Sequence, residues 1–353
     1  MAHRPLIALA LGDPAGIGNE VAVRALSDAE TFEAADWLIV GDRRLWALGE
    51  EQAGAACAIA DFDPGRFERV AFLDLAHAEL GAVTVGQSSV ACGTVALQNF
   101  RTALRLAADG MADAVCFTPF NKQSMRLGDP DYVDEIGFIQ RSIETEVAGS
   151  EFNVLDEVWN ARVTSHVPLA KVAELITPER IERSIRLTHE TMQAAGFPNP
   201  RIGVAALNPH AGDGGNFGTE DKEIIAPAVR AAAQKQYRVS GPIPSDTVYV
   251  RALKGEFDAV LTMYHDQGQI AIKLIGFDRG VTLIGGYPFW IATPAHGTAY
   301  DIAGKGIADP GATIAAFRLA ARLSGQSRRG VAVDPATRLR AVRDIVFDAE
   351  AVV

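Results

Sequence analysis

The sequence has few cysteines and fewer basic than acidic residues. Its cysteines, Cys57, Cys92 and Cys116 in 353 residues, are odd in number, widely spaced and set among apolar neighbours. This pattern argues against a disulfide framework and a cysteine-rich zinc site, and it indicates the reduced thiols of a cytoplasmic protein. The 33 Lys and Arg residues against 44 Asp and Glu residues give a formal net charge of −11. That charge argues against a nucleic-acid-binding protein, because phosphate backbones require a basic face.

Long hydrophobic runs, internal repeats and low-complexity segments are also missing. No apolar run approaches the roughly 20 residues that a membrane-spanning helix needs. Residues 1–5 show no signal-peptide pattern and lead into a strand-like stretch, so we expect a cytoplasmic protein. Hydrophobic residues make up 48% of the chain and aromatic residues only 7%, which predicts a large, mostly aliphatic core. A length of 353 residues suits two domains or one large α/β unit.

Apolar runs of strand length alternate with helical patterns along the chain. Because these runs are apolar almost throughout, they predict strands that are covered on both faces of a sheet. The alternation predicts an α/β fold with a mostly parallel sheet. We expect strands at residues 6–11, 37–40, 114–118, 202–207, 259–263 and 281–284, and a final strand or helix at 336–353.

The clearest helix is predicted over residues 177–195. Thr177 suits the N-cap, Pro178 the first helical position and Glu179 the first turn, where the helix dipole is positive. Gly196 is expected to end the helix. A stripe of residues at helical spacing should face the core: Ile181, Ile185, Thr188, Met192 and Ala195.

Three strand-then-loop segments each end in a histidine among small or polar residues. They contain His166, His210 and His265. Three neutral imidazoles with an open fourth position can form a catalytic divalent-metal site. The alternative for each is a hydrogen-bonded structural histidine, but three in such loops favour the metal site. Asp266 could orient an imidazole or a bound water, and Asp246 is a further carboxylate candidate.

Four further segments are rich in glycine or follow an apolar run directly. In open α/β sheets, ligands bind beyond the carboxyl ends of the strands, so these segments are expected to share one crevice. Alternatives remain open, since a plain turn could explain the first and a solvated lysine the second. The segments are 11–20, which could offer amides to an anion; 118–122, which ends in Lys122; 207–218, around His210; and 295–308, which suits the adenosine end of a nucleotide.

Taken together, these motifs resemble the 4-hydroxythreonine-4-phosphate dehydrogenase family of vitamin B6 biosynthesis, from about residue 6 to about residue 323. The motifs that carry the resemblance are Gly12-Asp13-Pro14-Ala15-Gly16-Ile17-Gly18, Thr118-Pro119-Phe120-Asn121-Lys122, Asn208-Pro209-His210-Ala211-Gly212, Gly241-Pro242 with Asp246-Thr247, Met263-Tyr264-His265-Asp266-Gln267-Gly268, and His296-Gly297-Thr298-Ala299 with Asp301-Ile302-Ala303-Gly304. The last motif also resembles the nucleotide loop of the isopropylmalate and isocitrate dehydrogenases.

The resemblance implies an isocitrate/isopropylmalate dehydrogenase-like two-domain α/β/α sandwich that forms a homodimer with a shared active site. We expect residues 1–120 with 280–353 to form the nucleotide-side domain, and 121–279 the metal, substrate and dimerisation domain. A small hydroxy acid would be oxidised by NAD or NADP at a secondary alcohol, with loss of CO₂ from the β-keto acid. A divalent metal would assist; zinc fits best, while manganese, cobalt and magnesium remain alternatives.

The same resemblance assigns roles to individual residues. The metal would lie on His166, His210 and His265. Lys273 would contact substrate, and Asp246 or Asp266 would handle protons. The cofactor-binding candidates are Gly12, Asp13, Gly214, Gly215, Gly218, His296, Thr298 and Asp301.

The chain departs from the family at positions expected to contact substrate. Where the family carries Gly-His-Thr-Glu, this chain has Asp134-Glu135-Ile136-Gly137, and family Asn and Arg positions hold Thr282 and Ile291. Two donors suited to an anion are thus missing, and Glu135 would repel a phosphate. The departures favour retained chemistry on a non-phosphorylated substrate, unless Arg126 or Arg279 compensates.

Four alternatives remain open from the sequence. The chain could be an authentic 4-hydroxythreonine-4-phosphate dehydrogenase that tolerates these substitutions. It could be a cis-dihydrodiol dicarboxylate dehydrogenase of aromatic degradation, to which apolar Ile291 is suited but Glu135 is not. A non-catalytic nucleotide-binding module is disfavoured, because all three histidines and Lys273 are present. A metal-dependent hydrolase would gain support only if the protein failed to bind NAD(P)⁺.

Overall fold

The structure is a computed structural model that describes residues 4–63 and 69–326, and the chain divides into two compact units. The first unit comprises Met1–Gly149 and Tyr287–Val353, and the second comprises Ser150–Gly286. The second unit is thus inserted into the first. The element expected at 336–353 lies outside the described residues. No helix among those described is long and apolar enough to cross a membrane.

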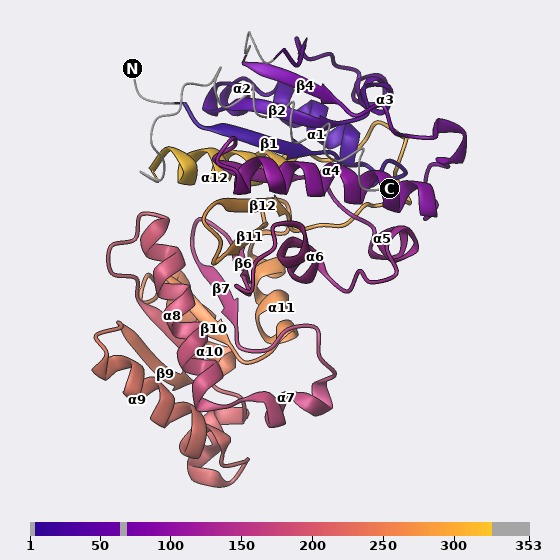
Figure 1. Ribbon diagram of the computed structural model, residues 1–353. Coiled ribbons are helices and arrows are strands. Elements are labelled where there is room, and N and C mark those ends of the chain that lie inside the picture. Colours follow the sequence, from indigo (N-terminus) through magenta and orange to yellow (C-terminus); the bar gives the residue numbers. More distant parts are fainter. Residues whose placement is uncertain (1–3, 64–68, 327–353) are drawn as a thin grey trace. The chain divides into compact units, whose positions relative to one another are not determined.

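The first unit holds a parallel sheet with strand order β3-β4-β2-β1-β5-β12. Helix α4 packs on β1, β2 and β5, while α12 packs on β12, β5 and β1 (Figure 1). The β1-to-β2 and β4-to-β5 connections cross the sheet in opposite directions, so right-handed crossovers put α1 and α4 on opposite faces. The elements are β1 (Leu6–Ala10), α1 (Gly18–Ser27), α2 (Ala29–Ala34), β2 (Asp36–Gly41), α3 (Arg43–Ala53), β3 (Ala60–Asp61), β4 (Val70–Asp74), η1 (Leu80–Ala82), α4 (Val90–Ala108), β5 (Ala114–Phe117), α5 (Lys122–Gly128), α6 (Glu135–Ser142), β12 (Trp290–Pro294) and α12 (Gly311–Gln326).

The second unit holds strands in the order β11-β6-β7-β10-β8-β9. Strand β6 runs antiparallel to both β11 and β7, and the other pairs are parallel. Its elements are β6 (Ser150–Val154), β7 (Trp159–Arg162), α7 (Leu169–Leu175), α8 (Pro178–Ala194), β8 (Ile202–Ala205), η2 (Pro209–Gly215), η3 (Asp221–Ile225), α9 (Ala226–Gln234), β9 (Val239–Ile243), α10 (Ser245–Leu253), β10 (Ala259–Thr262), α11 (His265–Gly276) and β11 (Val281–Gly285).

The predicted α/β class with a mostly parallel sheet is confirmed, and each of the six expected strands is present. Helix α8 follows its prediction closely: the Thr177 side chain accepts a hydrogen bond from the Arg180 amide, and Pro178 is the first helical residue. The predicted stripe from Ile181 to Ala195 is buried. Gly196, with φ of 92°, follows the end of the helix.

Residues 121–149 group with the first unit, although the sequence analysis places them in the second domain. The reason is close packing of α5 and α6 on α4. The Phe100 ring of α4 stacks on the Phe138 ring of α6 at 5.7 Å between centroids. Gly93 of α4 faces the backbone of α5, where a Cβ would overlap the Ser124 carbonyl oxygen.

This glycine contact leads to a testable prediction. Gly93→Ala should lower the free energy of unfolding by about 1–3 kcal/mol, because neither backbone can move away without unpacking α5 from α4. The measurement is thermal and urea unfolding. Gly81→Ala is the matched control, because a Cβ at Gly81 would meet nothing within 4 Å. Equal stability of the two variants would contradict the prediction.

Candidate functional site

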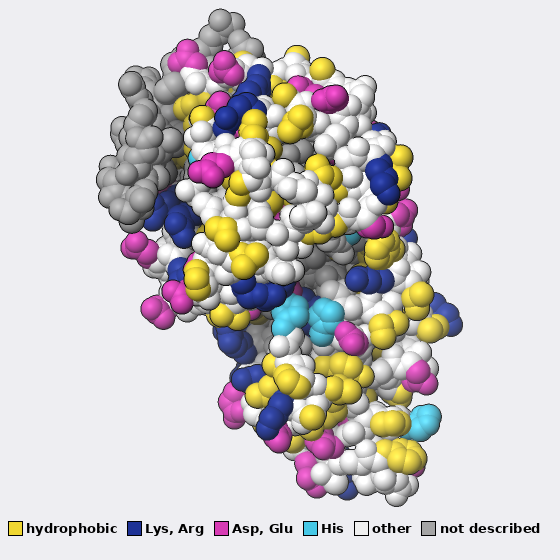
Figure 2. Space-filling model, turned by 90° about the vertical axis from the view of Figure 1, so that its right-hand side faces the viewer, with side chains coloured by type: hydrophobic (Ala, Val, Ile, Leu, Met, Phe, Trp, Pro, Cys, Tyr) yellow, Lys and Arg dark blue, Asp and Glu magenta, His cyan; other side chains and the backbone are white. Residues whose placement is uncertain are grey.

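Two of the three predicted metal-binding histidines lie close together in the second unit. The ring centroids of His166 and His265 are 5.4 Å apart. His166 follows β7 and His265 follows β10, and these strands are parallel neighbours, so their carboxyl ends meet. Figure 2 shows two histidine side chains lying side by side on the face drawn.

The imidazole of His265 has a carboxylate partner. Its Nδ1 lies 2.7 Å from Oδ1 of Asp266, the next residue of α11. When the imidazole is neutral, a carboxylate that accepts from Nδ1–H leaves the lone pair on Nε2. The contact therefore prepares Nε2 of His265 for a metal or a proton.

His210 lies in a strained loop that follows β8. The segment from His210 to Gly214 has positive φ throughout, at 55°, 55°, 79°, 43° and 69°, and His166 has φ of 44°. Residues other than glycine pay about 1 kcal/mol or more for this conformation, and such strain concentrates at functional sites. Asp221 fixes the start of the loop, since its carboxylate accepts from the amides of Leu207 (2.8 Å) and Asn208 (3.0 Å).

The donor set therefore fits a divalent metal in part. In residues 4–63 and 69–326, no group of three His, Cys, Asp or Glu side chains is close enough to hold one ion. The His210 ring is exposed and lies 6.2 Å from the Phe217 ring instead. Of the glycines in this loop, Gly214 is exposed, and Gly215 and Gly218 have φ near 117°, which only glycine adopts readily.

The remaining predicted catalytic and substrate-binding residues of the second unit are at least partly accessible. Lys273 is exposed on α11 with its Nζ 5.8 Å from the centre of the Phe277 ring. Asp246 is exposed in the first turn of α10, and Thr282 is half-buried on β11. Among the ion pairs of the described residues, none involves Lys273 or Asp246. Arg279, the possible compensating cation, is engaged: its Nη1 lies 2.6 Å from Glu157.

Sequence reasoning missed a buried polar network beneath these residues. Asn160 of β7 accepts from the Tyr249 hydroxyl of α10 at 2.6 Å and lies opposite Asn153 of β6. Further along β7, Arg162 is buried and pairs with Glu151. The polar residues of β6 and β7 break the apolar pattern expected of a buried strand. Their hydrogen-bond partners lie in other elements, and residue spacing in the sequence does not reveal such partners.

In the first unit, the loop after β1 and the segment 295–308 are hydrogen-bonded to each other although they lie nearly 290 residues apart. The Tyr300 hydroxyl donates to Oδ2 of Asp13 at 2.8 Å, and the Ile17 amide donates to the Thr298 carbonyl at 3.0 Å. A Cβ on Gly12 would overlap the carbonyls of the loop that follows β5, so this position requires glycine. The predicted cofactor residues Gly12, Asp13 and Thr298 are therefore held together.

Side chains of α1 hold the rest of the segment 295–308 in place. Oε1 of the buried Glu20 accepts from the Ala308 amide at 2.9 Å, and Arg24 donates to the Gly306 carbonyl at 2.7 Å. His296 is half-buried with its Nδ1 3.0 Å from the Gly297 carbonyl, and Asp301 is exposed. The segment 295–308 thus has a fixed backbone.

Lys122 and Glu135 form an ion pair in the first unit. Lys122 Nζ lies 3.2 Å from Oε2 of Glu135, and the neighbouring Ile136 is half-buried. Burial and the nearby Glu135 charge raise the pKa of Tyr132. Ile291, expected near substrate, is 0% exposed on β12 beside Val115 of β5. This burial argues against direct contact of Ile291 with a ligand.

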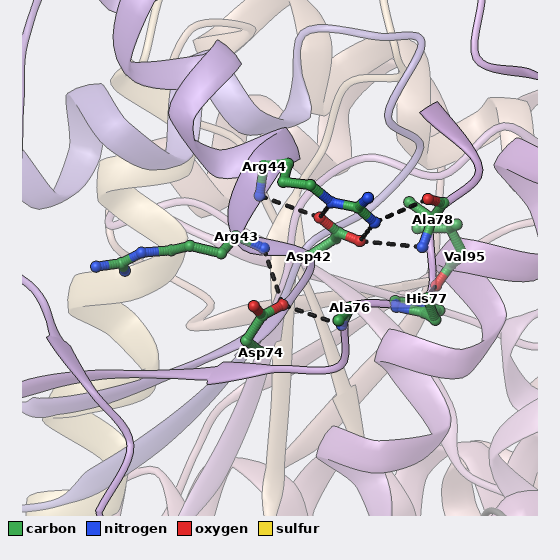
Figure 3. Close-up of polar contacts among 8 residues, drawn as sticks. All are labelled: Asp42, Arg43, Arg44, Asp74, Ala76, His77, Ala78 and Val95. Atoms are coloured by element: carbon green, nitrogen blue, oxygen red, sulfur yellow. Dashed lines mark hydrogen bonds and ion pairs between the residues drawn. The ribbon is translucent and has the colours of Figure 1, made fainter. Parts of the chain in front are cut away.

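A second cluster at the carboxyl ends of β2 and β4 is structural (Figure 3). The fully buried Asp42 caps α3, accepting from the Arg44 amide at 3.0 Å and the Ala78 amide at 3.0 Å. The Arg44 guanidinium also donates to both carboxylate oxygens, from Nε to Oδ1 at 2.9 Å and from Nη2 to Oδ2 at 2.7 Å. Both carboxylate oxygens of Asp42 are therefore engaged within the protein.

Comparison with known proteins assigns the chain to a family. The model of the family described as "Pyridoxal phosphate biosynthetic protein PdxA" matches residues 33–320. "Putative 4-hydroxythreonine-4-phosphate dehydrogenase 2" of Rhizobium meliloti (strain 1021) is 52% identical over 331 residues, covering 92% of this chain and 95% of its own. "Putative D-threonate 4-phosphate dehydrogenase" of Oceanobacillus iheyensis is 34% identical over 340 residues, covering 92% and 99%.

A solved structure agrees with the sequence matches. The 4-hydroxythreonine-4-phosphate dehydrogenase of Klebsiella pneumoniae superposes with a TM-score of 0.79 at 30% identity, covering 91% of this chain and 99% of its own. The match to the family model includes His166, His210 and His265, and the similarity to relatives extends over most of this chain. The chain therefore belongs to the pyridoxal phosphate biosynthetic protein PdxA family.

Proposed function

We propose that this protein is a metal-dependent, NAD(P)-linked dehydrogenase that oxidises a secondary alcohol of a small hydroxy acid and then loses CO₂ from the product. The observation that carries the proposal is the pairing of His166 with His265, whose ring is set by Asp266. The names of its relatives support dehydrogenase chemistry on a CH–OH group.

His166 and His265 would hold the divalent metal, and the strained loop would bring His210 as the third ligand. A metal bound there supplies a Lewis acid that lowers the pKa of the alcohol. The all-imidazole set favours zinc, cobalt or manganese over magnesium. Asp266 keeps His265 in the tautomer that binds.

The other residues of the second unit serve the substrate. Lys273 is exposed and carries a positive charge that suits the carboxylate of a hydroxy acid. Asp266 already contacts His265, which leaves Asp246 as the candidate to take the alcohol proton. A bound nicotinamide would supply the acceptor for the hydride of the carbinol carbon. The resulting β-keto acid then breaks its bond to the carboxylate carbon, and the electron pair remains on the α-carbon until it is protonated.

The nucleotide would bind at Gly12, Asp13, His296, Thr298 and Asp301 of the first unit. Gly214, Gly215 and Gly218 of the second unit remain further candidates for cofactor binding. Support comes from the fixed segment 295–308 and from the close approach that Gly12 permits. Backbone amides at such turns suit a pyrophosphate. Either NAD or NADP is compatible with these residues.

The proposed substrate carries no phosphate group on the part that contacts α6. The support is the Lys122–Glu135 ion pair, since Glu135 already neutralises the nearest lysine and would repel a phosphate. Glu135, Ile136, Lys273 and Thr282 are the proposed substrate contacts. A phosphorylated four-carbon hydroxy acid, as in the relatives' names, is the second candidate, and a cis-dihydrodiol dicarboxylate is the third.

A substrate panel with one variant tests this proposal. NADH formation at saturating zinc would be compared for 4-hydroxythreonine, D-threonate and their 4-phosphates. The wild type should prefer the non-phosphorylated acids, and Glu135→Gln should raise kcat/KM for the phosphorylated ones by about 10-fold, as removal of one repulsive charge implies. Glu146→Gln, an exposed change of the same type, should alter nothing.

Two outcomes of that panel would count against the proposal. Efficient wild-type turnover of a 4-phosphate would show that the phosphate binds away from Glu135. Binding of NAD(P)⁺ without turnover of any hydroxy acid would support a nucleotide-binding module.

We also propose a cytoplasmic homodimer. An exposed apolar stripe on and after α11 supports the dimer, with Ile270, Leu274 and Phe277 exposed by 61%, 83% and 60%. Unpartnered apolar stripes of this kind commonly pair with another protein surface. The three cysteines are free thiols, which supports a cytoplasmic location. Sedimentation of the purified protein at twice the chain mass would support the dimer.

A further inference from the structure

Three side chains form a hydrogen-bond chain inside the first unit. The Tyr300 hydroxyl donates to Oδ2 of Asp13 at 2.8 Å, and Ser124 Oγ lies 3.4 Å from the same Tyr300 oxygen. A phenol has one proton, and here Asp13 accepts it. The Tyr300 oxygen, which can accept as well as donate, therefore lies between Asp13 and Ser124 and contacts both.

The chain lies in a dry environment. Asp13 is 1% exposed and Ser124 is fully buried. Burial raises the pKa of Asp13, while the Ala15 amide and the Tyr300 and Ser124 hydroxyls act to lower it. No cation pairs with Asp13 among the ion pairs of the described residues. Hydrogen bonds to such a carboxylate count for more than in water, and an unmatched partner is costly.

The three residues come from three separate motifs. Asp13 lies in the loop after β1, and Tyr300 in the segment 295–308 that follows β12. Ser124 lies in α5, whose first residue is Lys122, the partner of Glu135. The Ile17 amide fixes the segment at Thr298, and the Glu20 carboxylate fixes it at Ala308. The Tyr300 side chain ties it to α5 through Ser124.

We propose that Tyr300 is a positioning residue that couples the segment 295–308 to helix α5, so that dinucleotide affinity depends on this hydrogen-bond chain. The inference rests on the proposed function, which assigns the segment to the nucleotide. Without the phenol oxygen, both Asp13 Oδ2 and the Ser124 hydroxyl lose a partner in a buried position. The segment then loses its side-chain anchor, while its contacts at Thr298, Gly306 and Ala308 remain. The residues around position 300 become less ordered, and ordering them on binding lowers the affinity for the dinucleotide.

The test is dinucleotide binding by calorimetry, with wild type, Tyr300→Phe and a matched tyrosine variant. Tyr300→Phe should raise the dissociation constant by about 5- to 30-fold, while kcat at saturating dinucleotide stays within about threefold. Tyr249→Phe is the matched control, because it also removes a buried hydroxyl with one hydrogen-bond acceptor, in the second unit. It should leave the dinucleotide dissociation constant unchanged.

A second measurement separates a linked chain from independent bonds. If the chain acts as a unit, Ser124→Ala added to Tyr300→Phe should weaken binding no further than Tyr300→Phe alone. Amide hydrogen exchange of residues 295–308 without nucleotide should also rise in Tyr300→Phe and not in Tyr249→Phe. Additive effects of the two substitutions would overturn the coupling.

The two failures can be told apart. If wild type binds dinucleotide and Tyr300→Phe binds it equally well, the positioning role is wrong and the proposed function stands. If correctly folded, metal-loaded wild type binds neither NAD⁺ nor NADP⁺, the proposed function fails and the role of Tyr300 falls with it. A lower kcat at unchanged affinity would also overturn the positioning role.

Discussion

Replacing His265 with alanine is expected to remove the bound metal and to lower kcat/KM by at least about 1000-fold. The change deletes one of the two imidazoles that lie together and also leaves Asp266 without its ring partner. Lewis-acid stabilisation of a developing alkoxide is worth several kcal/mol, and about 1.4 kcal/mol corresponds to tenfold in rate. Metal content by mass spectrometry and turnover with added zinc are the measurements.

His189→Ala provides the control for the metal prediction. His189 is a half-buried histidine of α8 whose ring packs on Tyr237, so its loss alters the surface of the same unit away from the pair. It should keep metal and turnover. Asp266→Asn should lie between the two, with metal affinity about 10- to 100-fold weaker. Full metal content and activity in His265→Ala would contradict the assignment of the site.

Asp42→Ala is expected to lower the free energy of unfolding of the first unit by about 2–4 kcal/mol. The substitution removes the α3 cap and leaves the Ala78 amide, a buried donor, without its acceptor. For a unit of this size, the unfolding temperature should fall by roughly 5–10 °C. Differential scanning calorimetry measures it.

The neighbouring carboxylate of β4 is the matched control. Asp74 accepts from the Arg43 amide at 3.1 Å and the Ala76 amide at 3.0 Å, but it is exposed, so water can replace it (Figure 3). Asp74→Ala should cost under about 1 kcal/mol. An equal loss in both variants would show that burial of Asp42 is not the cause.

The stabilisation by Asp42 should depend on pH. Burial acts to raise its pKa, but the Arg44 guanidinium and the two amides outweigh burial and lower the pKa from 3.8 to about 2. A carboxyl whose pKa is lower in the folded state stabilises the fold above its unfolded pKa. This contribution is present above about pH 4 and is lost as the pH falls towards 2. Asp42→Asn should lack this part of the acid dependence.

The core strands could be predicted from the sequence because they are apolar throughout. Strands β1, β5, β8 and β10 are runs with no exposed face, and such runs stand out in a sequence. Strands β6 and β7 escaped because Asn153, Asn160 and Arg162 interrupt them. Their burial depends on partners in other strands and in α10, and a single segment does not reveal such partners.

The site was predictable to a similar extent. The expectation that strand ends gather histidines holds for His166 and His265, whose strands are adjacent and parallel. His210 also follows a neighbour of β10, yet its left-handed loop separates it from the pair. The path of that loop depends on six consecutive positive φ angles, three at glycines and three at other residues, and the sequence does not dictate them. The Tyr300 anchor was missed because it joins residues nearly 290 positions apart.

The insertion of the second unit has a consequence for the order of events during synthesis. Strand β12 pairs with β5, and α12 packs on both, but about 140 residues of the second unit emerge from the ribosome between them. At a translation rate of roughly 5–20 residues per second, the edge of β5 stays unpaired for about 10–30 s until β12 has been synthesised. During that interval the nascent chain exposes an unpaired apolar strand. Chaperone dependence of the newborn chain should therefore be greatest just before residue 290 appears.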